Sequence, residues 1–242
     1  MQEREIFSRL NIVTPYVVRL DGRAFHHLTS DLGFEKPYDD RFNDAMCRVC
    51  EALISKSGLE PDFAYTFSDE ISLFFSKTIF NGRVEKIDSV CASYAASALT
   101  LFLGLLEPVS FDSRVVCVDS QSFPEYFSWR QKEAWRNHMN AYCQNALIKE
   151  GFSAQQTAKN LSGVGSKQMH EMMFERGVNL AKTPAWQRRG IVVHKKSVIR
   201  KGYNPIKNEE VETERKVVVV DKDIPLFDTP EGLDYICKIS GQ

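Results

Sequence analysis

The sequence predicts an α+β fold in which a ferredoxin-like βαββαβ unit is followed by a helical section and a C-terminal β-hairpin. Three observations support this prediction. Apolar residues recur with strand and helix periods, in the βαββαβ order, over the first half of the chain. Aromatic and amide residues then recur at helical spacing over residues 125–150. A basic segment and a strand-like run at 216–220 follow.

The elements of the first unit can be placed one by one. Strand-like runs bounded by turn residues alternate with segments that carry apolar residues at helical spacing. In order, we expect a strand at 16–20, a helix through 42–53, strands at 63–67 and 71–75, a helix through 87–105 and a strand at 114–118. In a unit of this type the first and third strands usually lie side by side.

Acidic residues mark the ends of these two neighbouring strands. Asp21 follows the first strand, and Asp69 and Glu70 lie between the second and third. Alone, each acid is typical of a hairpin turn. Together they are expected to meet, and ionised carboxylates beside a buried sheet are costly unless they are paired or bind a cation. The pattern therefore predicts two Mg²⁺ ions held by Asp21, Asp69 and the Gly22 carbonyl, the layout of a nucleotide-polymerase palm.

Glu70 has two open interpretations. On a strand it would point to the opposite face from Asp69. It either ligates the metal through the turn or accepts a supporting hydrogen bond.

Length and composition predict how the chain is divided. The 242 residues are 43% hydrophobic, which suits a globular protein with a substantial core. We expect residues 1–124 to form a palm-like catalytic core, and residues 125–242 to form a helical section with a basic hairpin, packed on the core as one compact unit. Ser153 is the expected N-cap of a helix, residues 160–167 are an expected loop, and the tail 225–242 has no assignment. A cytoplasmic protein with no membrane partner is expected, because no leader or long apolar run is found.

Two short motifs point to other kinds of site, and neither is favoured. Cys47 and Cys50 form a CxxC pair, but no second ligand pair follows at the spacing of a structural zinc site. The glycines of residues 163–167 resemble those of a phosphate-binding loop, but the full spacing and the preceding strand are missing. We therefore expect reduced core thiols and no P-loop.

The charge distribution predicts a contact with RNA. The formal net charge is −1, but residues 186–201 contain six Lys or Arg and no acid. Such a segment is commonly only a solvated strand. Beside a polymerase-like unit, it is expected to contact RNA phosphates.

Six segments, in order, resemble the tRNA-His guanylyltransferase family, including its archaeal and bacterial guanylyltransferase-like members. They are VVRLDGRAFHHLT, FEKPYDDRF, TFSDEISLFF, FDSRVVCV, YFSWRQKEAWRNHMNAY and RRGIVVHKK, and the match covers roughly residues 5–200. The resemblance implies a nucleotidyltransferase that extends the 5′ end of tRNA in the 3′-to-5′ direction. It implies that ATP activates a 5′ monophosphate, that an incoming nucleotide, usually GTP, displaces AMP, and that pyrophosphate is then removed. It also implies the acceptor stem of tRNA as partner and a homodimer or homotetramer.

The same resemblance implies roles for individual residues. The catalytic set is Asp21, Asp69 and Glu70. The residues expected to bind the nucleotide and its phosphates are Arg23, His26, Lys36, Ser68, Arg83, Lys86 and Arg114. The residues expected to contact tRNA are Arg136, His138 and Asn140, together with Arg188, Arg189, Lys195, Lys196 and Arg200, which the charge of the basic segment indicates. Arg83 and Lys86 are three positions apart, so one helix face would present both to a polyphosphate.

One segment bears on template use. Where eukaryotic enzymes that add one G to tRNA-His have His-Ile-Asn-Asn, this chain has His138, Met139, Asn140 and Ala141, and alanine cannot hydrogen-bond. We therefore predict template-dependent addition to 5′-truncated tRNA, with addition of a single G to tRNA-His as the alternative. A nucleotidyl cyclase and a non-catalytic RNA-binding module are more remote, because neither accounts for both the paired acids and the basic segment.

Overall fold

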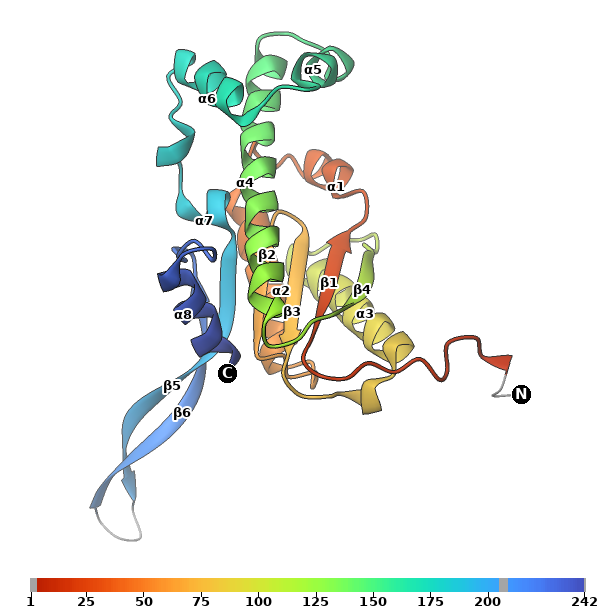
Figure 1. The fold of residues 1–242 in the computed structure, drawn as a ribbon, viewed down its shortest axis with the longest axis vertical. Coiled ribbons are helices and arrows are strands. Elements are labelled where there is room, and N and C mark those ends of the chain that lie inside the picture. Colours follow the sequence, from red (N-terminus) through yellow and green to blue (C-terminus); the bar gives the residue numbers. More distant parts are fainter. Residues whose placement is uncertain (1–3, 205–208, 242) are drawn as a thin grey trace.

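The fold is organised around one antiparallel sheet with the strand order β4-β1-β3-β2-β5-β6 (Figure 1). The computed structural model describes residues 4–204 and 209–241. The strands are β1 (Tyr16–Gly22), β2 (Phe63–Phe67), β3 (Glu70–Phe75), β4 (Phe111–Cys117), β5 (Ile191–Asn204) and β6 (Glu209–Asp221). As expected, β1 and β3 are neighbours, and their register runs from Tyr16 opposite Phe75 to Asp21 opposite Glu70.

The expected helices are present in order, and the structure adds four that were not expected: α1 after β1, and α6, α7 and α8 in the second half of the chain. The helices are α1 (Phe25–Asp31), α2 (Asp40–Ser55), α3 (Val84–Leu103), α4 (Ser122–Lys149), α5 (Ala154–Leu161), α6 (Ser166–Glu175), α7 (Ala185–Arg189) and α8 (Pro230–Ser240). Two 3-10 turns, Phe80–Gly82 and Leu180–Lys182, precede α3 and α7.

Alternate residues of the strands pack on the two faces of the sheet. Val18 and Leu20 of β1 join a core cluster with α2 and α3, whereas Val17 joins a second cluster with α4 and α8. Every residue of β2 and β3 is buried, so the centre of the sheet is covered on both sides.

Helix α4 connects the sheet to an outer group of helices. Phe123 and Phe127, in its first half, pack on the sheet. Met139 and Cys143, in its second half, pack with side chains of α5 and α6 in a third cluster. Figure 1 shows α4 running past the end of the sheet towards α5 and α6. The middle of α4 therefore passes the edge of the sheet where β1 ends.

The expected cap at Ser153 is confirmed, and two neighbouring assignments need correction. Ser153 and Gln156 exchange side-chain to backbone hydrogen bonds of 2.9 and 3.2 Å in a capping box. The loop expected at 160–167 is shorter, because α5 continues to Leu161 and α6 begins at Ser166. The unassigned tail contains α8, which Thr229 caps ahead of a first-turn proline.

The hairpin of β5 and β6 extends beyond the rest of the sheet as an arm (Figure 1). Only Ile191 to His194 of β5 pair with β2, whereas β5 pairs with β6 from Val192 to Asn204. The start of β5 is therefore core, and the remainder of the arm is held by β6.

The cysteine and membrane expectations can be compared with the same structure. The thiols of Cys47 and Cys50 are free and buried, and burial raises the pKa of Cys47 to about 11. Over residues 4–204 and 209–241, no helix is long and apolar enough to cross a membrane.

Candidate active site at the ends of β1 and the β2–β3 turn

The turn between β2 and β3 brings Asp69 next to Asp21. Ser68 and Asp69 form this two-residue turn, and Ser68 adopts φ 52°, in the left-handed region. The register places Asp21 opposite Glu70, and the Gly22 N–H donates to the Asp69 carbonyl at 3.2 Å. The two acids predicted to converge therefore lie close together, Asp21 near the end of β1 and Asp69 in the β2–β3 turn beside it.

The carboxylates of Asp21 and Asp69 repel each other. Burial raises the pKa of Asp69, and the charge of Asp21 raises it further. Among the described residues, no Lys or Arg forms an ion pair with either carboxylate. The pair thus carries negative charge that a divalent cation could balance.

The donor set fits Mg²⁺ only with help from a substrate. In the described part of the chain, no group of three or more His, Cys, Asp or Glu is placed to hold a metal. Mg²⁺, however, is commonly bound by one or two carboxylates together with substrate phosphates. Asp21, Asp69 and the main chain of Gly22 satisfy that requirement.

Gly22 allows α1 to fold closely over the end of β1. A Cβ at this position would lie 2.6 Å from the ring of Phe25. That ring is buried and makes edge contacts with Phe42 and Phe111. The close packing positions His26 and the rest of α1 beside the acids.

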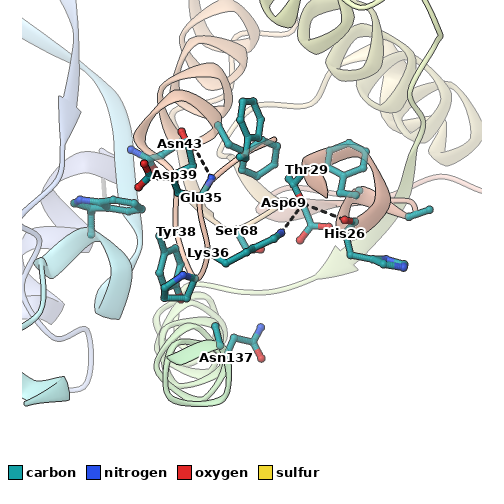
Figure 2. A pocket seen from close by; sticks show the side chains of 18 residues that line it. His26, Thr29, Glu35, Lys36, Tyr38, Asp39, Asn43, Ser68, Asp69 and Asn137 are labelled. Carbon is teal, nitrogen blue, oxygen red and sulfur yellow. Dashed lines mark hydrogen bonds between the residues drawn. The ribbon is translucent and has the colours of Figure 1, made fainter. Parts of the chain in front are cut away.

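A pocket of about 320 Å³ opens beside Asp69 (Figure 2). Its lining includes three predicted nucleotide ligands, His26, Lys36 and Ser68. The Lys36 ammonium group donates to the Thr29 hydroxyl at 2.7 Å, and Figure 2 shows this side chain extending past Ser68 toward Asp69. The pocket therefore places the Lys36 ammonium group on the same side as the Asp69 carboxylate, where it could bind a phosphate.

Asp39 fixes the wall of the pocket that carries Lys36. It caps α2 by accepting from the Arg41 N–H at 2.8 Å, and it also accepts from the Glu35 N–H at 2.8 Å. Arg41 holds the pKa of Asp39 well below its usual range. The segment before α2 is thereby tied to the helix.

Glu70 is held by Arg130, a residue that the sequence did not single out. Arg130 donates from Nε to one Glu70 oxygen at 2.7 Å and from Nη2 to the other. Both residues are 7% exposed, and the guanidinium group also lies over the rings of Phe67 and Trp129. Of the two interpretations left open for Glu70, the structure favours hydrogen-bond acceptor over metal ligand.

The prediction that Arg83 and Lys86 line the triphosphate site needs correction. β3 runs away from Asp69. The start of α3, which follows β3 in the chain, therefore lies at the opposite end of the strands from Asp69. There Arg83 is exposed, and its backbone forms an isolated β-bridge with Asn11. The Lys86 ammonium group lies 4.7 Å from the centre of the Phe80 ring. Neither lines the pocket.

Arg114 and Arg23 lie near the acids but outside the pocket. Arg114 pairs with Asp112 at 2.9 Å, and Asp112 is the register partner of Asp21 on β4. The negative charge of Asp21 helps to raise the pKa of Arg114, after the larger effect of Asp112. The Arg23 side chain is exposed, and the backbone N–H of Arg23 donates a hydrogen bond to the Ser110 carbonyl.

The predicted tRNA contacts on α4 need partial correction. His138 is fully buried and shares a 3.0 Å hydrogen bond with Thr183, so its side chain is unavailable to tRNA. Arg136 is exposed and pairs with Glu133, and Asn140 donates to the Arg136 carbonyl at 3.0 Å. Asn137 and Ala141, on another face of the helix, line the pocket instead. The helical period from Arg130, through positions 134, 137 and 141, could have indicated this face.

Burial of His138 predicts a loss of stability in mild acid. It lowers the pKa of His138 to about 4, whereas an unfolded histidine titrates near 6.5. Between these values only the unfolded chain binds the proton, so stability is lost as the pH falls. From about pH 7.5 to about pH 5 we expect this residue to contribute a loss of roughly 2 kcal/mol.

Urea unfolding of the parent protein and of His138→Gln measures this contribution. The variant should be less stable near neutrality but should lose less of its stability on acidification. Equal losses in the two proteins would show that His138 is not the titrating group.

Two arginines of the basic segment are tied to the structure. Arg188 donates from Nε to the Thr183 carbonyl at 2.8 Å, and Arg189 donates from Nη1 to the Ile224 carbonyl at 2.9 Å. On β5, Lys195 is half-buried and Lys196 is exposed. Arg200 lies in β5, but its side chain is outside the described part of the structure.

Two family descriptions match the chain: "tRNAHis guanylyltransferase" over residues 1–119 and "Thg1 C terminal domain" over residues 121–225. The chain belongs to the tRNA(His) guanylyltransferase family. It is accordingly an enzyme, a nucleotidyltransferase, and the family's reaction is the addition of nucleotides to tRNA. Membership sets aside the cyclase and the non-catalytic binding module.

Curated relatives agree with this assignment. A probable tRNA(His) guanylyltransferase of Dictyostelium discoideum is 34% identical over 200 residues, 75% of each chain. The tRNA(His) guanylyltransferase of Neurospora crassa is 34% identical over 213 residues, 81% of this chain and 72% of the relative. The match to tRNA(His) guanylyltransferase 1 of Arabidopsis thaliana, 33% identical, covers 75% of this chain and 34% of that longer protein.

Solved structures show the same fold. A bacterial tRNA(His) guanylyltransferase (Thg1)-like protein in complex with ATP has a TM-score of 0.77 at 24% identity, covering 99% of this chain and 96% of that one. The tRNA(His) guanylyltransferase of Saccharomyces cerevisiae has a TM-score of 0.68 at 26% identity, covering 88% and 94%. The mixed helical and antiparallel architecture is thus that of the family.

Proposed function

We propose that this enzyme extends the 5′ end of 5′-truncated tRNA in the 3′-to-5′ direction, with a template base selecting each nucleotide and ATP activating a 5′ monophosphate. The observation that carries the proposal is the meeting of Asp21 and Asp69 beside a pocket that Lys36 also lines. Solved neighbours described as complexes with ATP and with GTP support nucleotides as ligands of this pocket.

In this proposal β4-β1-β3-β2, with α2 and α3, form a ferredoxin-like palm. The strand order and the two covering helices support that description. Residues 1–124 then form the catalytic core, and residues 125–242 pack against it through α4.

Asp21, Asp69 and the Gly22 carbonyl are the groups that would hold two Mg²⁺ ions. When bound, Mg²⁺ neutralises phosphate charge and lowers the pKa of the attacking hydroxyl. Lys36 then binds a phosphate oxygen, and the Ser68 hydroxyl donates to another. The rings of Tyr38 and Trp186 pack edge to face, with 5.6 Å between their centres, and form an apolar wall for the base.

The position of Ala141 supports a template. This residue lines the pocket, where its methyl group offers no hydrogen bond to a nucleotide base. Pairing with the opposite strand of the acceptor stem would then provide the selectivity that the protein does not.

The proposal predicts that incorporation follows the opposing base. The substrate is a 5′-monophosphorylated tRNA that lacks its first nucleotide, prepared in four versions with C, A, G or U facing the gap. With ATP and all four nucleotides present, the complementary nucleotide should be added in each case. A version with an abasic site facing the gap controls for untemplated addition and should be extended poorly. Addition of G to all versions, or only to tRNA-His, would refute template use.

Binding of the rest of tRNA is assigned to the basic segment and to α4. Lys195, Lys196 and Arg200 on β5, together with Arg136 and Asn140, are the proposed backbone contacts. Self-association into a dimer or tetramer is also proposed. Exposed apolar side chains that such an interface could cover are Ile6 at 87%, Val13 at 80% and Leu106 at 99%.

A further inference from the structure

A second pocket lies on the far side of α4 from the candidate active site. It has a volume of about 370 Å³ and lies between α4, α7 and the segment before α8. The residues that line it are Ser128, Gln131, Lys132, Trp135, Ala181, Arg188, Arg189, Leu226 and Asp228. At 3.6 residues per turn, its α4 positions point about half a turn away from Asn137 and Ala141.

The walls of this pocket are fixed by one buried glutamine. Gln131 is 4% exposed and donates to the carbonyls of Pro225 at 3.0 Å and Arg189 at 3.3 Å. Its Oε1 accepts from the Phe227 N–H at 2.8 Å. The side chain therefore connects α4 to both opposite walls of the pocket.

Positive charge dominates the pocket. Lys132, Arg188 and Arg189 face a single carboxylate, Asp228, which pairs with Lys132 at 3.2 Å. Within the described residues, neither arginine has an ion-pair partner, and the buried Arg189 Nε has no hydrogen-bond partner. Burial lowers the pKa of Arg188 and the charge of Arg189 lowers it further, while the charge of Asp223, outside the pocket lining, opposes them only in part. A bound anion would relieve this repulsion.

Aromatic rings continue the same surface. The Trp135 ring lines the pocket and stacks on His138 at 5.4 Å between ring centres. An adjoining hollow of about 560 Å³ shares Ser128, Lys132 and Asp228, and it adds Trp129, which is 48% exposed. Trp129, Trp135 and Lys132 of α4, with Arg188 and Arg189 of α7 across the pocket, match the combination that binds single-stranded nucleic acid, with stacked bases and paired phosphates.

We propose that this groove along α4 binds unpaired nucleotides of the RNA substrate. Its lining supplies stacking surfaces and cations but few groups that read base edges, so binding should depend little on sequence. The inference rests on the proposed function only in taking RNA as the substrate. Because the groove and the active site flank the same helix, about 10 Å across, one RNA end can reach both.

Leu226 offers a test that leaves the scaffold intact. It is 45% exposed at the wall of the pocket, so Leu226→Glu adds a negative charge, and Leu226→Gln is the matched neutral control. The probe is a fluorescein-labelled single-stranded RNA tetranucleotide with a 5′-hydroxyl, followed by fluorescence anisotropy. We expect Leu226→Glu to weaken binding about tenfold relative to Leu226→Gln, because a like charge is placed against the phosphates. Lys36→Ala, in the other pocket, should leave the affinity within about twofold.

Three results would overturn the inference: equal affinities of Leu226→Glu and Leu226→Gln, no binding by the parent protein, or displacement of the tetranucleotide by an equal concentration of AMP. The last result would assign the groove to free nucleotides. Extension of 5′-truncated tRNA by the parent protein is measured separately. Its failure would contradict the proposed function, whichever way the tetranucleotide binds.

Discussion

Asp69→Asn and Asp21→Asn should each reduce nucleotide addition about a thousandfold, because loss of several kcal/mol of stabilisation of the transferring phosphate has that effect on rate. The substitution keeps the shape of each side chain and removes its charge. Burial and the neighbouring Asp21 already disfavour ionised Asp69, so Asp69→Asn should leave the fold as stable as before, or more so.

Single-turnover addition to a 5′-triphosphorylated tRNA measures the effect without the activation step. Asp88→Asn is a matched control, since burial also raises the pKa of Asp88, which accepts a 2.7 Å hydrogen bond from Ser113 away from the pocket. It should retain nearly full activity. Comparable rates for Asp69→Asn and Asp88→Asn, with unchanged circular dichroism, would remove Asp69 from the site.

Arg130→Met should produce the largest loss of stability, about 3–5 kcal/mol, because it leaves a buried carboxylate without its partner. Glu70 is 7% exposed and both of its oxygens accept from Arg130. Methionine retains much of the apolar stem of arginine, so the lost charge dominates the change.

The pH dependence identifies the cause. Burial raises the pKa of Glu70 even in the parent, and loss of Arg130 would raise it further. An acid whose folded-state pKa is raised contributes more stability as the pH falls, so the deficit of Arg130→Met should shrink from neutrality toward pH 5. Urea unfolding of Arg130→Met and of the double variant Arg130→Met/Glu70→Leu completes the comparison. The double variant should recover most of the stability, and a double variant as unstable as the single one would contradict the account.

Local sequence patterns were sufficient to predict the first four strands of the sheet and the meeting of Asp21 and Asp69. Short apolar runs bounded by turn residues predicted β1, β2, β3 and β4, and the βαββαβ order predicted that β1 and β3 are neighbours, which places Asp21 beside Asp69. Ser153 could be recognised because a capping box depends on residues only three positions apart.

The other site residues could not be placed from the sequence, because their positions depend on contacts between distant segments. Arg83 and Lys86 have the spacing of a phosphate-binding helix face, but only the direction of β3 shows that they start α3 at the far end of the strands. The sequence predicted that His138 contacts RNA, but in the fold α4 packs near Thr183 and His138 is buried. Arg130 carried no signal of its own, because its partner Glu70 is sixty positions away. These outcomes depend on how elements pack, which spacing along the chain does not determine.

The metal site is tested most directly by a crystal structure of the protein with GTP and Mn²⁺, in which anomalous scattering locates the metal. We expect Mn²⁺ to be ligated by carboxylate oxygens of both Asp21 and Asp69 and by the triphosphate, with Lys36 on a phosphate oxygen. Mn²⁺ bound to the triphosphate alone, away from both carboxylates, would contradict this expectation.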